Sequence, residues 1–124
     1  MHRVLVIDDE SSVRAAIRLS LEFLGIDVEE AENGKVGLEK ARGSPPDLIL
    51  CDLDMPVMDG FETLAQARQD PVLGSVPVIV VSGLITEESE RRVMDAGAKA
   101  VLRKPFPIDT LASLVRRFCG QRTD

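Results

Sequence analysis

Five polar side chains that lie just after apolar segments of the sequence have the chemistry to act together. They are Asp8, Asp9, Asp52, Ser82 and Lys104. An aspartate can attack phosphorus and form an acyl phosphate, while a lysine and a hydroxyl can contact the oxygens of the transferring group. These residue types therefore suit transfer of a phosphoryl group to a carboxylate. Gly83, next to Ser82, would keep side-chain bulk away from such a group.

Three carboxylates in one place also predict a bound cation. Two unit charges 4 Å apart repel by about 4 kcal/mol at an effective dielectric near 20, so the cluster must protonate or bind a positive ion. Oxygen-only ligands favour Mg²⁺, or Mn²⁺ in its place. The single histidine, His2, lies outside the cluster, and Cys51 and Cys119 lack the spacing of zinc ligands. We interpret both cysteines as buried or half-buried thiols in a reducing compartment.

The elements that must bring these side chains together alternate along the chain. Strands are predicted at residues 4–7, 26–31, 47–51, 77–81 and 100–102. Helices are predicted at residues 13–24, 33–41, 61–68, 86–97 and 108–118. Asn33 and Thr86 are expected to be N-caps, and Gly25 and Gly97 stand where helices should end.

The hydrophobic pattern of the strands indicates the fold class. Apart from Asp47 at the start of 47–51, all the predicted strands except 26–31 are apolar, so we expect them to be buried on both faces. This is typical of a parallel sheet with helices on both sides. Ligands bind such a sheet beyond the carboxyl ends of its strands, where the strand order reverses. One aspartate after a strand is usually a cap or turn residue, but the joint occurrence of five polar residues indicates a site.

Length and composition limit the remaining possibilities. The 124 residues fit one domain, with residues 119–124 as a polar tail or the start of a linker. Apolar residues make up 44% and aromatic residues 3%, so the core must be aliphatic. A net charge of -6 argues against binding to nucleic acid or to an anionic membrane. No apolar run approaches the roughly 20 residues that span a bilayer, and the N-terminus lacks a signal-peptide pattern, so we expect a cytoplasmic protein.

Longer motifs surround the polar residues. They are Val4–Glu10, Asp47–Gly60, Pro77–Gly83, Asp95–Ala98 and Lys104–Phe106. On these motifs, and over essentially its whole length, the chain resembles the receiver domain of two-component response regulators, including chemotaxis regulators. The resemblance implies an α/β, flavodoxin-like doubly wound sheet of five parallel strands in the order 2-1-3-4-5, with five helices.

The resemblance also implies a role for each residue of the cluster. Asp52 is the expected phospho-acceptor, and Ser82 and Lys104 are expected to contact the phosphoryl group. The expected magnesium ligands are Asp8 or Asp9 together with Asp52 and the backbone carbonyl of Asp54. The Lys104–Pro105 peptide bond is expected to be cis, in a tight turn.

The expected partners also follow from the resemblance. The donor would be a sensor histidine kinase, a histidine phosphotransfer protein or a small phosphodonor, and the output a downstream protein or a fused domain. Phosphorylation would switch the face formed by the fourth helix, fifth strand and fifth helix. Apart from taking up the phosphoryl group and slowly losing it, the chain is not expected to be an enzyme. We expect no direct binding to nucleic acid or membrane, and a monomer or weak dimer.

Val101 and the pair Lys99–Ala100 depart from the family pattern, and the role of Asp54 stays open. Val101 stands where an aromatic side chain usually swings inward, so we expect Ser82, Gly83 and the start of the fourth helix to relay the output. Asp54 either faces the phosphoryl group and tunes its hydrolysis or is a solvated loop residue. Lys99–Ala100 replaces an acidic pair, so the salt-bridged dimer face of winged-helix regulators is not expected.

Two other functions stay open from the sequence. The pair Asp52 and Asp54 is similar to the aspartates of haloacid-dehalogenase-type phosphatases, but those follow the first strand, and Asp8 and Asp9 would then have no role. Turnover of a phosphomonoester would favour that enzyme. The other function is that of a receiver that docks without phosphorylation. Failure of the chain to label with a small phosphodonor and magnesium would favour it.

Overall fold

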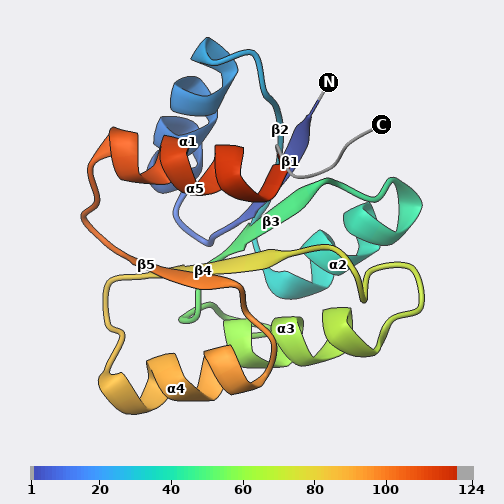
Figure 1. Cartoon of the computed structure of the whole chain (residues 1–124). Coiled ribbons are helices and arrows are strands. Elements are labelled where there is room, and N and C mark those ends of the chain that lie inside the picture. The colour runs from blue at the N-terminus through green and yellow to red at the C-terminus, as the bar shows by residue number, and fades with distance from the viewer. Residues whose placement is uncertain (1, 120–124) are drawn as a thin grey trace.

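The computed structural model describes residues 2–119, which form a parallel sheet with helices on both faces (Figure 1). The strands are β1 (Arg3–Ile7), β2 (Asp27–Ala31), β3 (Leu48–Cys51), β4 (Val78–Ser82) and β5 (Ala100–Arg103). The helices are α1 (Ser11–Phe23), α2 (Gly34–Gly43), α3 (Gly60–Gln69), α4 (Glu87–Asp95) and α5 (Ile108–Cys119). The strand order is β2-β1-β3-β4-β5 with parallel neighbours, which confirms the predicted fold. The predicted polar tail beyond Cys119 lies outside the described residues.

Local hydrogen bonds explain where two of the helices begin. The Asn33 side chain accepts a hydrogen bond from the backbone N–H of Val36 at 2.9 Å, which caps α2. Thr86 caps α4 by accepting from the Ser89 N–H at 3.1 Å, and the Ser89 hydroxyl accepts from the Thr86 N–H at 2.8 Å. This reciprocal pair is a capping box. Both predicted N-caps are therefore confirmed.

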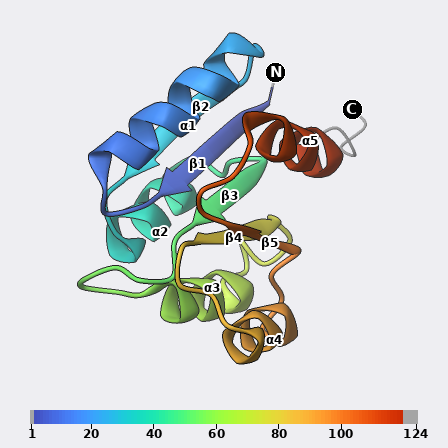
Figure 2. The ribbon, with the colours of Figure 1, turned by 90° about the vertical axis from the view of Figure 1, so that its left-hand side faces the viewer.

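The core consists of two aliphatic layers, one on each face of the sheet. Figure 2 shows α1 and α5 on one face and α2, α3 and α4 on the other. The layer under α1 and α5 includes Val4, Val6, Leu48, Leu50, Ile79 and Val81. The layer over α2, α3 and α4 includes Leu5, Ile7, Ile49, Cys51, Val78 and Val80. Within residues 2–119, no helix is long and apolar enough to cross a membrane.

Strand β5 corrects one expectation. Its apolar sequence predicted burial on both faces, but only Leu102 is buried, while Ala100 and Val101 are half-buried and Arg103 is exposed. The reason is the strand order, which leaves β5 with one neighbour, β4, at the edge of the sheet.

The loop between β3 and α3 contains a strained residue. Val57 has φ 73°, and the N–H of Met58 donates to the carbonyl of Pro56 at 2.8 Å, which closes a three-residue turn. A β-branched residue is rare at positive φ. Val57 is also 76% exposed, so packing does not compensate for the strain.

We expect Val57→Gly to raise the free energy of unfolding by about 1 kcal/mol, because glycine adopts positive φ without a steric penalty. Urea denaturation measures this change. Val72→Gly is the matched control, since Val72 is also exposed but is not among the residues with positive φ. The control should be slightly destabilised. Equal decreases in the free energy of unfolding of both variants would contradict the claim that Val57 is strained.

Candidate functional site

The ends of four strands bring the predicted polar residues to one edge of the sheet. Asp8 follows β1, Asp52 follows β3, Ser82 is the last residue of β4, and Lys104 follows β5. Backbone hydrogen bonds continue the sheet into these positions. The N–H of Asp52 donates to the Ile7 carbonyl at 2.9 Å, and the N–H of Lys104 donates to the Ser82 carbonyl at 3.0 Å. The sheet itself therefore fixes where these side chains start.

Lys104 links two buried carboxylates at this edge. Its Nζ donates to Asp8 Oδ2 at 2.8 Å and lies 3.6 Å from Asp52 Oδ2. The side chains of Asp8 and Asp52 are only 3% and 7% exposed. The peptide bond between Lys104 and Pro105 is cis. The ammonium thus offsets part of the repulsion between the carboxylates.

Burial and these charges change the pKa values of both partners. Burial raises the pKa of Asp52 to about 6, with Lys104 opposing the rise and Asp8 adding to it. Burial alone would lower the pKa of Lys104, but the hydrogen bond to Asp8 and the charge of Asp52 outweigh it and raise that pKa. Close to neutral pH, Lys104 is therefore charged, and its ammonium lies between the carboxyl groups of Asp8 and Asp52.

Three consecutive acids form a candidate metal cluster. One carboxylate oxygen from each of Asp8, Asp9 and Glu10 lies within 4.8 Å of the others, with Asp8 buried and the other two exposed. The N–H of Glu10 donates to Asp8 Oδ1 at 2.9 Å, which orders this turn. A partly exposed, oxygen-only donor set of this kind fits a hard divalent cation. Glu10 was not predicted, although its position directly after the two aspartates was the available signal.

Ser82 lies beside Asp54. The Ser82 hydroxyl donates to Asp54 Oδ2 at 3.5 Å and accepts from the N–H of Leu84 at 3.3 Å. The carboxylate of Asp54 is therefore exposed but directed toward the site edge. Within residues 2–119, no hydrogen bond or ion pair joins Ser82 or Asp9 to Asp52.

Gly83 and Val101, the two other positions of the expected switch region, differ in their surroundings. A Cβ added to Gly83 would meet only Lys104 Cβ, at an ordinary 3.8 Å. Val101 packs against the aliphatic layer over α3 and α4.

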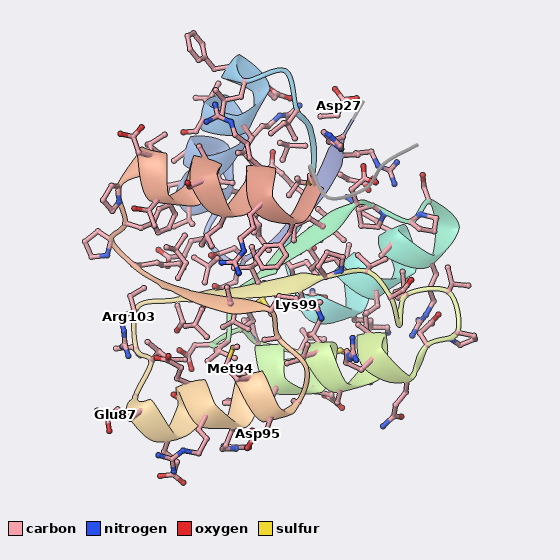
Figure 3. The ribbon with its side chains drawn as sticks, viewed as in Figure 1. Asp27, Glu87, Met94, Asp95, Lys99 and Arg103 are labelled. Carbon is pink, nitrogen blue, oxygen red and sulfur yellow. The ribbon has the colours of Figure 1, made fainter. Side chains whose placement is uncertain are left out.

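Arg103, which the sequence did not single out, donates to the Ile85 carbonyl at 2.7 Å and to Glu90 at 3.0 Å. It points toward the start of α4 (Figure 3), so it ties β5 to the loop that follows Ser82.

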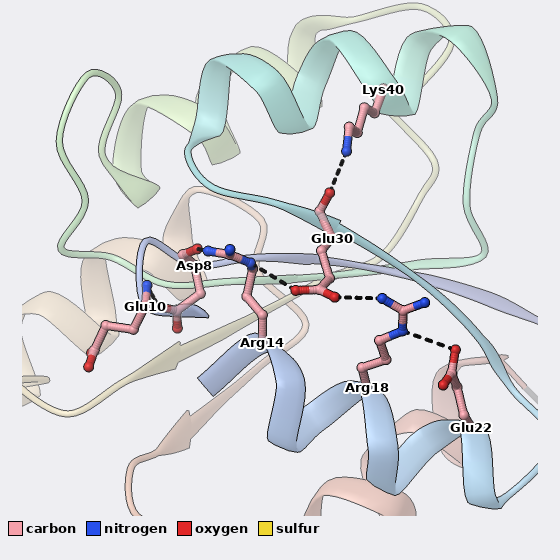
Figure 4. Close-up of polar contacts among 7 residues, drawn as sticks. All are labelled: Asp8, Glu10, Arg14, Arg18, Glu22, Glu30 and Lys40. Atoms are coloured by element: carbon pink, nitrogen blue, oxygen red, sulfur yellow. Dashed lines mark hydrogen bonds and ion pairs between the residues drawn. The ribbon is translucent and has the colours of Figure 1, made fainter. Parts of the chain in front are cut away.

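A second unpredicted arginine supports the acidic turn. Arg14 donates through Nη1 to the backbone carbonyl of Asp8 at 2.6 Å and through Nε to Glu30 at 2.9 Å (Figure 4). Arg18 also binds Glu30, at 2.8 Å, and the hydrogen bond from Arg18 is the main reason that the pKa of Glu30 is lowered. Lys40 donates to the backbone carbonyl of Glu30. The network connects α1, β2 and α2 to the acidic turn.

Comparison with known proteins gives the class of the chain. The sequence profile of the response regulator receiver domain matches residues 4–116, so the chain belongs to this family of two-component signalling domains. It is 40% identical over 116 residues to the KDP operon transcriptional regulatory protein KdpE of Escherichia coli, covering 94% of this chain and 50% of KdpE. It is 38% identical over 116 residues to the gliding motility regulatory protein of Myxococcus xanthus, covering 93% of this chain and 15% of that protein.

Solved structures agree with this assignment. Chemotaxis protein CheY4 of Vibrio cholerae matches with a TM-score of 0.90 and 32% identity, over 95% of this chain and 98% of that chain. The receiver domain of Francisella response regulator 1452 matches with a TM-score of 0.90 and 31% identity, over 98% of both chains. The chain spans half or less of the length of the two curated relatives above.

Proposed function

We propose that this receiver domain is a switch that accepts a phosphoryl group on Asp52 with Mg²⁺, or Mn²⁺, bound beside it. The observation that carries the proposal is the position of Lys104, 2.8 Å from Asp8 and 3.6 Å from Asp52. A buried carboxylate next to a fixed ammonium suits attack on an anionic phosphodonor, because the cation offsets the repulsion between nucleophile and donor.

The residues present fit a magnesium ion. Asp8 or Asp9, with Asp52 and the backbone carbonyl of Asp54, would hold it, and the carboxylate of Glu10 is near enough to Asp8 and Asp9 to join them. When bound, the ion would neutralise charge on the oxygens of the transferring group.

The side chains of Asp52, Lys104 and Ser82 each have a separate role in the transfer. An Asp52 oxygen attacks phosphorus and forms the acyl phosphate, the bond from phosphorus to the donor breaks, and the leaving group takes a proton from solvent. Lys104 exchanges its contact with Asp8 for a phosphoryl oxygen. Ser82 donates its hydroxyl proton to another oxygen and leaves Asp54. The chain performs this acceptor half-reaction and the slow loss of the phosphoryl group, with no other catalytic turnover.

Mass spectrometry with acetyl phosphate and Mg²⁺ tests this function. The intact chain should gain one phosphoryl group, Asp52→Asn should gain none, and Asp27→Asn, an exposed control on β2, should label like the wild type. A wild-type chain that stays unlabelled would instead be a docking receiver. Labelling of Asp52→Asn at the native site, or sustained turnover of a phosphomonoester, would contradict the assignment.

The partners belong to the same proposal. The donor is a sensor histidine kinase or a histidine phosphotransfer protein, and the expected location is the cytoplasm, where ATP-driven kinases act. An apolar hollow of about 420 Å³ beside Lys104, lined by Val13, Ala16 and Phe106 among others, offers the donor a docking surface. The output is a downstream protein or a fused domain, since the curated relatives continue beyond the matched region. The domain itself binds neither nucleic acid nor membrane.

We expect the output to run through the loop after Ser82, because the N–H of Leu84 donates to the Ser82 hydroxyl and Arg103 holds the Ile85 carbonyl. On phosphorylation, amide NMR shifts should therefore change over residues 83–90. Shifts confined to the strand around Val101, with residues 83–90 unchanged, would refute this route.

Arg14→Lys should weaken magnesium binding about tenfold, the lower end of the usual effect of residues that orient metal ligands. Lysine keeps the positive charge but cannot hold the Asp8 carbonyl and Glu30 together, as the guanidinium does. Arg18→Lys is the matched control, because Arg18 binds Glu30 but makes no contact with the acidic turn. Magnesium titration followed by NMR gives the dissociation constants, and equal values for both variants would contradict the positioning role.

A further inference from the structure

Arg103, the last residue of β5, joins three elements through one guanidinium group. Its Nη1 donates to the backbone carbonyl of Ile85, in the loop between β4 and α4, at 2.7 Å. Its Nη2 donates to Oε1 of Glu90, on α4, at 3.0 Å. The Arg103 side chain is 54% exposed and is directed from β5 toward the start of α4 (Figure 3). We call these two contacts the Arg103 bridge.

The Arg103 bridge adjoins both residues that are proposed to contact the phosphoryl group. Lys104 follows Arg103 in the sequence, and Ser82 is paired with Arg103 in the parallel register of β4 and β5. The N–H of Leu84 donates to the Ser82 hydroxyl at 3.3 Å. The next residue is Ile85, whose carbonyl accepts from Arg103. If the Ser82 hydroxyl turns toward a phosphoryl oxygen, the Leu84 N–H must follow it or lose it, and either change shifts the adjoining carbonyl.

The helix that the Arg103 bridge holds is lightly packed. Of the nine residues of α4, all of which the structure describes, Val93 alone is buried. The capping box of Thr86 and Ser89 is internal to the start of the helix and reaches no strand. Segments with few buried apolar contacts change position at a low cost in free energy. The bridge therefore acts on a segment whose position a small difference in free energy can change.

We propose that Arg103 is a positioning residue of the switch, which stabilises the unphosphorylated form by holding the Ile85 carbonyl and Glu90 together. This inference rests on the proposed phosphorylation of Asp52. A contact that is made in only one of two forms shifts the equilibrium between them by the free energy of that contact. Phosphorylation must therefore break or lengthen the Arg103 bridge, and a chain without the bridge should bind a phosphoryl group more tightly.

Loss of the bridge also changes the surface that α4 and β5 offer to a partner. Arg103 lines a hollow of about 430 Å³ together with Glu87, Glu90, Arg91 and Met94. While Arg103 and Glu90 are paired, each satisfies the charge of the other. Phosphorylation would thus convert an internal ion pair into two charged groups that a partner can bind.

Titration with beryllium fluoride and Mg²⁺ tests the inference, because this anion forms a tetrahedral complex with a carboxylate that imitates an acyl phosphate. Arg103→Met keeps the aliphatic stem without its donors and should lower the dissociation constant about fivefold, the scale of one exposed charge-assisted hydrogen bond. Coulomb attraction alone predicts the opposite sign, because the variant removes a positive charge near an anionic ligand. Arg103→Lys should lower the constant about twofold, since an ammonium can hold only one of the two acceptors. Arg91→Met removes an equal charge from α4 without changing the bridge, and it should not lower the constant.

Amide NMR gives a readout that a merely structural loss would not produce. The signals of residues 83–90 in free Arg103→Met should move along the line that joins the free and the beryllofluoride-bound wild type. A wild type that binds no beryllofluoride would overturn the proposed function and this inference together. A wild type that binds it, with an equal or higher dissociation constant for Arg103→Met or with signals displaced away from that line, would overturn the inference alone. Circular dichroism checks that each variant is folded.

Discussion

Gly60→Ala should lower the free energy of unfolding by about 3 kcal/mol, as expected for an overpacked site that cannot relax. A Cβ at this position would lie 2.3 Å from the carbonyl oxygen of Asp52 and 2.6 Å from the Cα of Leu53. Both are backbone atoms, so no side chain can rotate away. The N–H of Gly60 also donates to the Leu53 carbonyl at 2.8 Å, which holds the start of α3 against the end of β3. Denaturation in urea measures the loss.

The same variant should label more slowly with acetyl phosphate, because any shift that relieves the clash moves the segment that carries Asp52. Gly43→Ala is the control, since a Cβ there would meet no atom within 4 Å. Because Gly43 is the last residue of α2, this variant should be stabilised by no more than about 1 kcal/mol. A Gly60→Ala chain as stable as the Gly43→Ala chain would show that helix and strand do not approach this closely.

In the presence of a chelator, Asp52→Asn should stabilise the chain by about 1–2 kcal/mol at pH 7.5 and by almost nothing below pH 4. Burial raises the pKa of Asp52 from 3.8 to about 6, so the folded chain holds this proton more tightly than the unfolded chain does. The stability that the folded chain gains by binding this proton is fully present at pH values below the pKa of Asp52 in the unfolded chain. It is lost as the pH rises through about 6. Asparagine cannot ionise and avoids the loss. Such a shift corresponds to about 3 kcal/mol at most, and water at the edge of the sheet screens part of it.

Urea denaturation from pH 3.5 to pH 8, with and without Mg²⁺, checks this expectation. Saturating Mg²⁺ should favour the wild type, because the ion binds the folded carboxylate and has no such ligand in the variant. Asp27→Asn, at an exposed position on β2, should follow the wild-type pH profile. A constant difference between Asp52→Asn and the wild type at every pH would mean that the Asp52 carboxylate is not the titrating group.

The fold and the location of the site could be predicted because both depend on local pattern. Apolar runs and capping residues such as Asn33 and Thr86 are short-range signals, and the predicted order of strands is confirmed. Polar residues at the ends of parallel strands must share one edge of the sheet. The structure accordingly places Asp8, Asp52 and Lys104 in contact.

The partners of long side chains could not be predicted, because they depend on distances between elements. In the sequence, Arg14 and Arg103 look like ordinary surface residues. In the structure, each donates a hydrogen bond to a backbone carbonyl in or near the site. Arg92 is exposed on α4, yet its guanidinium carbon lies 4.2 Å from the ring centre of Phe61. The partial exposure of Val101 follows from the edge position of β5, which its own apolar sequence does not encode.

The reach of Lys104 has a consequence for communication across the sheet. Its backbone follows β5 at one edge, whereas Asp8 follows β1, with β3 and β4 between them in the strand order. One side chain thus joins an outer strand to the middle of the molecule without passing through packed core residues. Neutralising or esterifying Asp8 and Asp52 would remove, in a single step, the ion pairs that hold Lys104. The turn that leads into α5 would then gain freedom even if every buried methyl group stayed in place.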